Sequence, residues 1–217
     1  DATDGYDTRN ITIEREQGGK KEEFTMELYG QPQDGWIVMT DDGHPYLYTE
    51  IQSENDWRTM EVFDLKGEKI RHVGTSNDSP HGALLNDPDE FYLTRRVDAL
   101  GTYDAYRKFH VGESGMPVAE NEVYTKVNIC DSKEDEAALV STRELPVTVF
   151  DGNGKEEKLP AGTKYYVRAT DLENFVDMEL SDGRRCRLAV KKSDKGWGFE
   201  IDGVYEEDCF EFIPYAG

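Results

Sequence analysis

The chain has 217 residues, of which 46 are acidic and 25 are basic, so its formal net charge is −21 and its isoelectric point is about 4.5. Nucleic acids and anionic membrane surfaces are bound by clustered lysine and arginine, so this balance argues against both as partners. A hydrophobic content of 36% with 11% aromatic residues is enough to build a core and argues against a disordered acidic chain. The length favours one large domain or two small ones.

The start of the chain predicts a tether. Residues 1–10 are mostly polar, with several acids, and are expected to be flexible. The sequence contains no transmembrane segment, which would need an apolar run of about 18 residues, and no basic-then-apolar leader. We therefore expect a soluble chain from which any signal peptide or lipid anchor has been removed.

Three cysteines, Cys130, Cys186 and Cys209, occur without Cys-x-x-Cys spacing. This argues against a zinc site and against a dense disulfide framework. Cys186 and Cys209 could pair if their strands are adjacent, which would leave Cys130 over. We expect instead that all three are small buried hydrophobes.

Alternating apolar residues separated by glycine turns predict antiparallel hairpins through most of the chain. In the first hairpin, a two-residue turn at Gly18-Gly19 places Ile13 opposite Phe24 and Ile11 opposite Met26. A one-residue slip would move every apolar side chain to the other face, so this register is the one that keeps the four together.

The second hairpin is expected to turn through a three-residue loop that ends in a left-handed Gly43. This loop pairs Val38 with Tyr46 and Trp36 with Tyr48. The opposite face also carries apolar residues, which predict a central hairpin covered on both sides: Ile37, Met39 and Leu47.

A third hairpin is expected between 58–63 and 68–73. An odd-numbered loop like that of the second hairpin pairs Val62 with Ile70. Further strands are expected at 90–97, 103–111 and 122–129. The charged segment 131–136 predicts a linker, where Ser132 could start one or two helical turns. We expect an antiparallel meander sheet or sandwich over 11–140 and a second β domain over 141–217.

In the C-terminal part, Val147 and Val149 alternate, and strands are expected at 163–169, 175–180, 184–190, 196–201 and 208–213. A three-residue loop, Ser181-Asp182-Gly183, with Gly183 left-handed pairs Met178 with Cys186 and Val176 with Leu188. This register is favoured over that of a two-residue turn because it leaves Arg185 and Arg187 in water.

Two stretches of this part carry a family resemblance. Leu159-Pro-Ala-Gly-Thr-Lys-Tyr-Tyr-Val-Arg168 followed by Phe175-Val-Asp-Met-Glu-Leu-Ser-Asp-Gly183 resembles bacterial SH3-like domains, over about a third of the chain. The resemblance implies a small SH3-like barrel and the binding of cell-wall or peptide ligands. The segment 91–103 is similar to stretches of uncharacterised secreted or lipoprotein-type proteins of Gram-positive gut bacteria, which implies an extracytoplasmic bacterial protein.

No catalytic constellation is visible. A hydrolytic triad needs a nucleophile, a base and an orienting acid, and the chain has no Gly-x-Ser-x-Gly motif. Asp131 opposes thiolate formation at Cys130 through like charge. We expect no catalytic residue, no cofactor and no enzyme activity, and we expect the four histidines to be surface or strand residues, with His81 the least ordinary: His44, His72, His81 and His110.

A calcium site is also not expected. Asp151 and Asn153 resemble the start of a calcium loop, but the twelfth position is Gly162 and not a carboxylate. With 46 acids some close carboxylate pairs are guaranteed, so a carboxylate-based hydrolase such as a glycosidase stays an alternative.

Aromatic residues give the remaining functional signal. Five residues of the C-terminal part could line a binding groove: Tyr165, Tyr166, Trp197, Phe199 and Tyr205. Trp197 lies between two glycines and is expected to be exposed. Tyr166 is out of phase with its neighbours, so either Tyr165 or Tyr166 should face outward. Trp197, Tyr166 and Tyr205 are the predicted ligand-binding residues.

Taken together, these patterns predict a non-enzymatic cell-envelope module of an extracytoplasmic bacterial protein, secreted or surface-anchored. Its expected ligand is a cell-wall peptide, a glycan or an envelope protein. The alternatives are the carboxylate-based hydrolase and a structural or assembly protein, which would show a large apolar patch or a symmetric interface.

Overall fold

The computed structural model of the chain describes residues 8–81, 85–127, 136–150, 154–194 and 196–216. These residues form several antiparallel sheets and two short 3-10 turns, with no α-helix among them, which confirms the predicted all-β class. No closed barrel is found in this part of the chain. Contacts between Cα atoms divide the chain into two compact units, Asp1–Arg95 with Arg107–Asn121 and Arg96–Tyr106 with Glu122–Gly217. The domain limits expected from the sequence stay a prediction.

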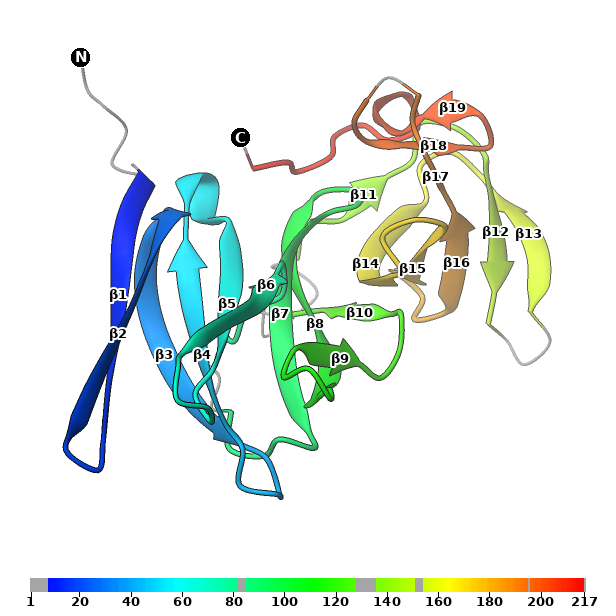
Figure 1. Ribbon diagram of the computed structural model, residues 1–217. Helices are drawn as coiled ribbons and strands as arrows, with labels where there is room; N and C mark the ends of the chain where they lie inside the picture. The colour runs from blue at the N-terminus through cyan, green and yellow to red at the C-terminus, as the bar shows by residue number, and fades with distance from the viewer. Residues whose placement is uncertain (1–7, 82–84, 128–135, 151–153, 195, 217) are drawn as a thin grey trace, which may run out of the picture. The chain divides into compact units, whose positions relative to one another are not determined.

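The first unit holds a two-stranded sheet, β1-β2, and a four-stranded sheet with the order β3-β4-β5-β6 (Figure 1). Strands β7 and β8 contribute residues to both units. The elements are β1 (Thr8–Gln17), β2 (Lys20–Tyr29), β3 (Gln31–Met39), β4 (Pro45–Gln52), η1 (Glu54–Asp56), β5 (Arg58–Asp64), β6 (Arg71–Ser76), β7 (Phe91–Asp98), β8 (Thr102–Val111) and β9 (Pro117–Ala119).

The registers predicted for the first two hairpins are confirmed. Gly18, Gly19 and Gly43 have positive φ angles, as the expected turns require. The four predicted pairs are formed: Ile11 with Met26, Ile13 with Phe24, Trp36 with Tyr48 and Val38 with Tyr46.

The expectation that the second hairpin is covered on both faces is wrong. Ile37 is 57% exposed and Met39 is 50% exposed. Both lie on β3, which is the edge strand of its sheet. The β1–β2 hairpin contacts a different strand, β5, through Phe24, whose ring packs edge-on against Phe63 with 5.8 Å between the ring centroids.

The register predicted for the third hairpin is also wrong. Val62 lies opposite Gly74 and not Ile70, because β5 and β6 are joined by six residues, 65–70, where the sequence predicted a three-residue loop. Ile70, the last residue of this connection, is buried outside the strands. A bulge between Val62 and Phe63 then shifts the register by one further residue.

The core of the first unit lies between the inner face of the four-stranded sheet and the β7–β8 ribbon. Tyr48 is fully buried, and its hydroxyl donates to the Gly115 carbonyl at 2.7 Å. Its ring meets the edge of Phe91 at 6.3 Å. The buried cluster comprises Val38, Tyr46, Tyr48, Met60, Val62, Leu85, Phe91, Leu93 and Phe109.

The second unit is built on a ladder of antiparallel strands with the order β13-β12-β16-β15-β14-β10-β8, to which β11 adds beside β14. A smaller sheet, β17-β18-β19, precedes the C-terminal segment. Its elements are β10 (Tyr124–Lys126), β11 (Leu139–Val140), β12 (Leu145–Val149), β13 (Lys155–Leu159), β14 (Lys164–Thr170), β15 (Phe175–Leu180), β16 (Arg185–Ala189), β17 (Lys191–Lys192), β18 (Phe199–Ile201), β19 (Val204–Tyr205) and η2 (Glu206–Asp208).

The register chosen for β15 and β16 is confirmed. Gly183 adopts φ 88°, and the predicted pairs Met178 with Cys186 and Val176 with Leu188 are formed. Arg185 is exposed, as expected, whereas Arg187 is partly covered because its guanidinium carbon lies 3.4 Å from the centroid of the Phe175 ring.

Several expected strands of this unit are shorter or absent. The strand expected at 208–213 is replaced by η2 and a single bridge between Ser141 and Phe210. The strand expected at 196–201 begins only at Phe199, because the two glycines before it have positive φ angles. Within the described part of the strand expected at 122–129, residues 122–127, only β10 is formed, and β9 was not expected. The linker 131–135 and Ser132 lie outside the described residues.

Both described cysteines, Cys186 and Cys209, are buried and unbonded, so they behave as the small core residues that the sequence favoured. Burial raises the pKa of Cys186 to about 12, which keeps it a neutral thiol. They share one core with residues from most strands of the unit, among them Val97, Leu100, Ala105, Tyr124, Leu139, Val147, Tyr165, Met178, Leu188 and Ile201. Cys130 lies outside the described residues.

Candidate functional site

Trp197 is presented to solvent by a turn with glycine on both sides. Gly196 and Gly198 adopt φ angles of 101° and 71°, which L side chains rarely adopt. The Ser193 amide donates to the Gly198 carbonyl at 3.0 Å and closes the turn. Trp197 is 56% exposed, as the sequence predicted.

Two tyrosines hold the indole in place. Tyr205, at the end of β19, meets it edge-on with centroids 5.9 Å apart. Tyr215, in the C-terminal segment, does the same at 5.5 Å. Edge-to-face pairs of this kind are favourable and fix the ring orientation. The structure therefore brings together two of the predicted residues, Trp197 and Tyr205, and adds Tyr215, which no local sequence pattern had marked.

A buried carboxyl group lies beside this aromatic cluster. Glu206 is fully buried, and its Oε1 accepts a hydrogen bond from the Tyr215 hydroxyl at 2.6 Å. Its Oε2 has no hydrogen-bond partner among the described residues. Burial raises the pKa of Glu206 more than the bonds from Tyr215 and the Phe199 amide lower it. A Cβ on Gly198 would lie 2.4 Å from Oε1, so only glycine fits over this carboxyl.

Tyr166 lies elsewhere in the unit and does not face solvent. It sits opposite Glu179, on the other face of β14 from Tyr165 and Val167, as its phase predicted. It is nevertheless only 9% exposed, and the Arg168 guanidinium lies 5.7 Å from its ring centroid. The expectation that Tyr165 or Tyr166 is outward-facing is therefore wrong, since both are buried.

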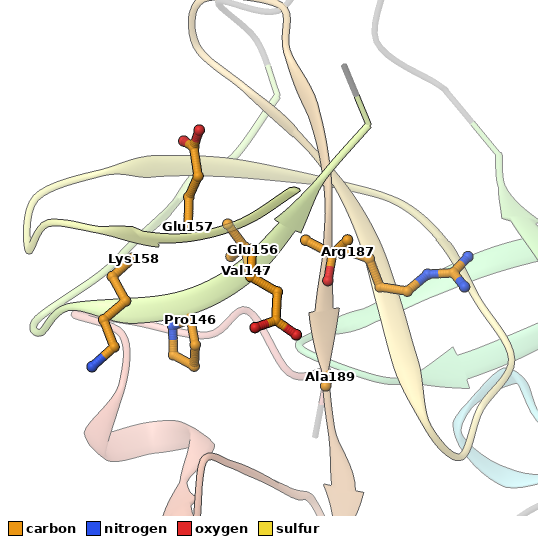
Figure 2. A pocket seen from close by; sticks show the side chains of 8 residues that line it. Pro146, Val147, Glu156, Glu157, Lys158, Arg187 and Ala189 are labelled. Carbon is orange, nitrogen blue, oxygen red and sulfur yellow. The ribbon is translucent and has the colours of Figure 1, made fainter. Parts of the chain in front are cut away.

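A groove of about 410 Å³ crosses the same face of β12, β13 and β16. Figure 2 shows the Glu156 carboxylate lying between Pro146 and Ala189, while the Arg187 guanidinium extends away from the groove. That guanidinium is held by Asp177 through hydrogen bonds of 2.7 and 2.9 Å. The groove therefore presents a carboxylate, an apolar floor and the stem of an arginine whose charge is already paired.

Two of the four histidines are paired with buried carboxylates of the four-stranded sheet. His44 bonds Asp64 at 2.7 Å and His72 bonds Glu61 at 2.6 Å. Burial opposes the ionisation of Asp64, but hydrogen bonds from Arg71, the Lys66 amide and His44 outweigh it and lower its pKa to about 2.

His81 belongs to a polar cluster around Glu50 in the first unit. The His81 amide donates to Glu50 Oε2 at 2.9 Å, and Arg58 Nη1 donates to His81 Nε2 at 2.8 Å. Arg58 Nε is 3.9 Å from Glu50 Oε1, too far for a direct bond. Burial raises the pKa of Glu50 against the opposing effects of Ser79 and Arg58. His81 itself adopts φ 40°, a strained backbone for a residue other than glycine.

No group of three or more His, Cys, Asp or Glu side chains suited to a metal ion occurs in the part of the chain that the structure describes. The calcium-like residues Asp151 and Asn153 lie outside it. Among the described helices, none has the length and apolar character needed to cross a membrane.

Comparison with known proteins finds no matching family model, no matching curated protein and no matching solved structure.

Proposed function

We propose that the protein is a non-enzymatic binding module of a bacterial cell envelope, acting outside the cytoplasm and capturing a peptide, glycan or protein ligand on Trp197 and Tyr205. The observation that supports it most is the exposed indole held between Tyr205 and Tyr215. Tryptophan and tyrosine dominate the energetics of binding surfaces. A ring already fixed by its neighbours loses little conformational freedom when a ligand covers it.

The size of the effect follows from the exposed area. Aromatic side chains bury roughly 150–250 Å² each, at about 25 cal/mol per Å². Because Trp197 is 56% exposed, a ligand that covers it would gain about 2–3 kcal/mol. The Trp197→Ala variant should therefore bind roughly 30-fold to 150-fold more weakly.

The finer fold assignment is part of the same proposal. We propose that residues 141–217 are related to SH3-like domains and that residues 11–140 form a meander or sandwich. In support, the Leu159-Pro-Ala-Gly162 stretch connects β13 to β14, and the Ser181-Asp182-Gly183 turn connects β15 to β16.

The test is a titration with muropeptides, chitin-type oligosaccharides and basic peptides, followed by tryptophan fluorescence and thermal shift. Trp57→Ala is the matched control, because Trp57 is also exposed, at 38%, and belongs to the first unit. A ligand that binds the native protein and Trp57→Ala equally, and Trp197→Ala more weakly, supports the proposal. No response across all three ligand classes, or equal binding by Trp197→Ala, contradicts it.

A carboxylate-based hydrolase is the second candidate, favoured by the buried Glu50 beside Arg58 and His81. A carboxyl group with a raised pKa is what a general acid needs near neutral pH. Turnover of aryl glycosides or peptide esters by the native protein, lost in Glu50→Gln, would replace the binding proposal. A structural or assembly role is favoured by the exposed Ile37 and Met39 on an edge strand, and a monomer in light scattering would count against it.

A further inference from the structure

A second hollow of the second unit has the composition of a small-molecule site. Its volume is about 350 Å³, at the small end of the range of roughly 300–1,000 Å³ for ligand pockets. It is bounded by the β7–β8 turn, the ends of β10 and β11, the middle of β14 and the C-terminal segment. Its apolar walls are Leu100, Val127, Leu139, Val167 and Pro214.

The turn that forms one wall is held in an unusual conformation. Leu100 adopts φ 57°, which is rare for a leucine, and Gly101 follows with φ 115°. The Thr102 amide donates to the Pro214 carbonyl at 3.0 Å, so the C-terminal segment is fastened to this turn. A Cβ on Gly101 would lie 3.3 Å from the Pro214 ring, which shows how closely the two approach. Strained backbone held by its surroundings is enriched at binding sites.

Tyr103 lines the pocket and carries an unused hydrogen-bonding group. Its hydroxyl is buried and has no partner among the described residues. Burial, with a smaller contribution from Asp98, raises the pKa of Tyr103, so the phenol keeps its proton. Leaving a buried hydroxyl without a partner is unfavourable, and a ligand that accepts its hydrogen bond would recover much of this cost.

Lys126 places a cation at the same pocket. Its ammonium lies 5.7 Å from the centroid of the Tyr103 ring and 2.8 Å from Glu136 Oε1. Glu136 also accepts two bonds from Arg168, at 2.8 and 2.9 Å, so two cations share one carboxylate there. An ammonium has three N–H groups, and Glu136 is its acceptor among the described side chains. Lys126 can therefore donate to a ligand without giving up its ion pair.

We propose that this pocket binds a small, mainly apolar molecule with one acceptor oxygen, such as a monocyclic aromatic carboxylate or amide, whose oxygen accepts from the Tyr103 hydroxyl and the Lys126 ammonium. The ring lies against the aliphatic walls, and the oxygen meets the two donors. This site is independent of the Trp197 surface and takes a different class of ligand.

The test uses three probes on the full chain, benzoate, benzamide and toluene, followed by amide chemical shifts in NMR spectra. Benzoate and benzamide are expected to shift amides of residues 100–104, 126–127 and 139, and toluene to bind more weakly. Tyr103→Phe should weaken both oxygen-bearing probes by about threefold to tenfold, the value of one hydrogen bond. Lys126→Met should weaken benzoate more than benzamide, because only benzoate is charged.

Two further variants make the result decisive. Tyr106→Phe removes a hydroxyl from the same strand but does not line the pocket, so its affinities should equal those of the native protein. Ala137→Phe places a ring at an exposed position of the pocket lining and should abolish binding without disturbing the core. The inference is overturned if no probe shifts these amides at millimolar concentration, or if Ala137→Phe binds as well as the native protein. Unchanged affinities in Tyr103→Phe would overturn it equally.

Discussion

The pair formed by Tyr215 and Glu206 gives the sharpest test of how the C-terminal segment is held. Tyr215→Phe removes one oxygen, which lies 2.6 Å from Glu206 Oε1, and leaves the ring that packs on Trp197. Glu206 is fully buried, so water cannot take the place of the lost donor. A hydrogen bond to a charged group is worth about 1.5–3 kcal/mol, and we expect the free energy of unfolding to fall by that amount when Glu206 is ionised.

The loss should grow with pH. The pKa of Glu206 is raised in the folded protein, so Glu206 destabilises the fold increasingly as pH rises from its unfolded value through its folded value. The Tyr215 hydroxyl opposes this shift, and removing it raises the folded pKa further. The unfolding free energy of Tyr215→Phe should therefore fall from the ordinary glutamate pKa of about 4.3 upward, and it should keep falling to a higher pH than that of the native protein.

The assay is urea unfolding across this pH range, followed by tryptophan fluorescence, with a double-mutant cycle against Glu206→Gln. In the Gln background the cost of Tyr215→Phe should shrink to about 0.5–1.5 kcal/mol and lose its pH dependence, because a neutral partner remains. Tyr92→Phe, at a tyrosine that is 47% exposed, is the control. A cost below about 0.5 kcal/mol at every pH, or the same cost in both backgrounds, would refute the reasoning.

Substitutions at three other positions test the fold. Asp64→Asn should lower the free energy of unfolding by about 2 kcal/mol at neutral pH, because the pKa of Asp64 is lowered to about 2 in the folded protein. In acid titrations of unfolding, the difference from the native protein should vanish as the pH falls from about 4 through 2. Gly115→Ala should prevent cooperative folding by circular dichroism, because a Cβ there would lie 2.1 Å from the Tyr46 ring; a native-like melting curve would contradict this. Gly183→Ala should lower the free energy of unfolding by about 1–2 kcal/mol. Gly183→Asn should lower it by less, because asparagine tolerates the left-handed φ. Equal losses in the two variants would argue against the left-handed turn between β15 and β16.

Hairpin registers were predictable where a glycine turn and the apolar face agreed. The glycines at 18, 19, 43 and 183 set loop lengths that left only one register able to keep the apolar residues together. The register predicted for the β5–β6 hairpin was wrong because Gly67 does not close a three-residue loop there: the connection spans residues 65–70, and a bulge beside Val62 shifts the register once more. The exposure of Ile37 depends on which strand ends at the sheet edge, and this is a property of the whole sheet.

The candidate site was predictable only in part. Trp197 stood out because glycines flank it, and Tyr205 was one of five aromatic residues of the C-terminal part that could line a groove. Glu206 is one of 46 acids, and nothing local distinguishes the one that becomes buried. Tyr166 has the phase of an exposed residue, yet Arg168 covers it. The Tyr103 pocket draws on segments far apart in the chain, so no window of sequence contains it.

Residues Arg96–Tyr106 belong to the second unit, although the residues on either side of them belong to the first. The chain therefore enters the second unit, returns to the first and then enters the second again. During synthesis the apolar side chains of Val97, Leu100 and Ala105 emerge before residues 122–217, which supply the rest of their core. These three side chains have no core partners at this stage, whereas the first unit can complete its own core once Arg107–Asn121 has been made. Translation order thus leaves the apolar side chains at the tip of the β7–β8 ribbon without their core partners until the last strands have been made.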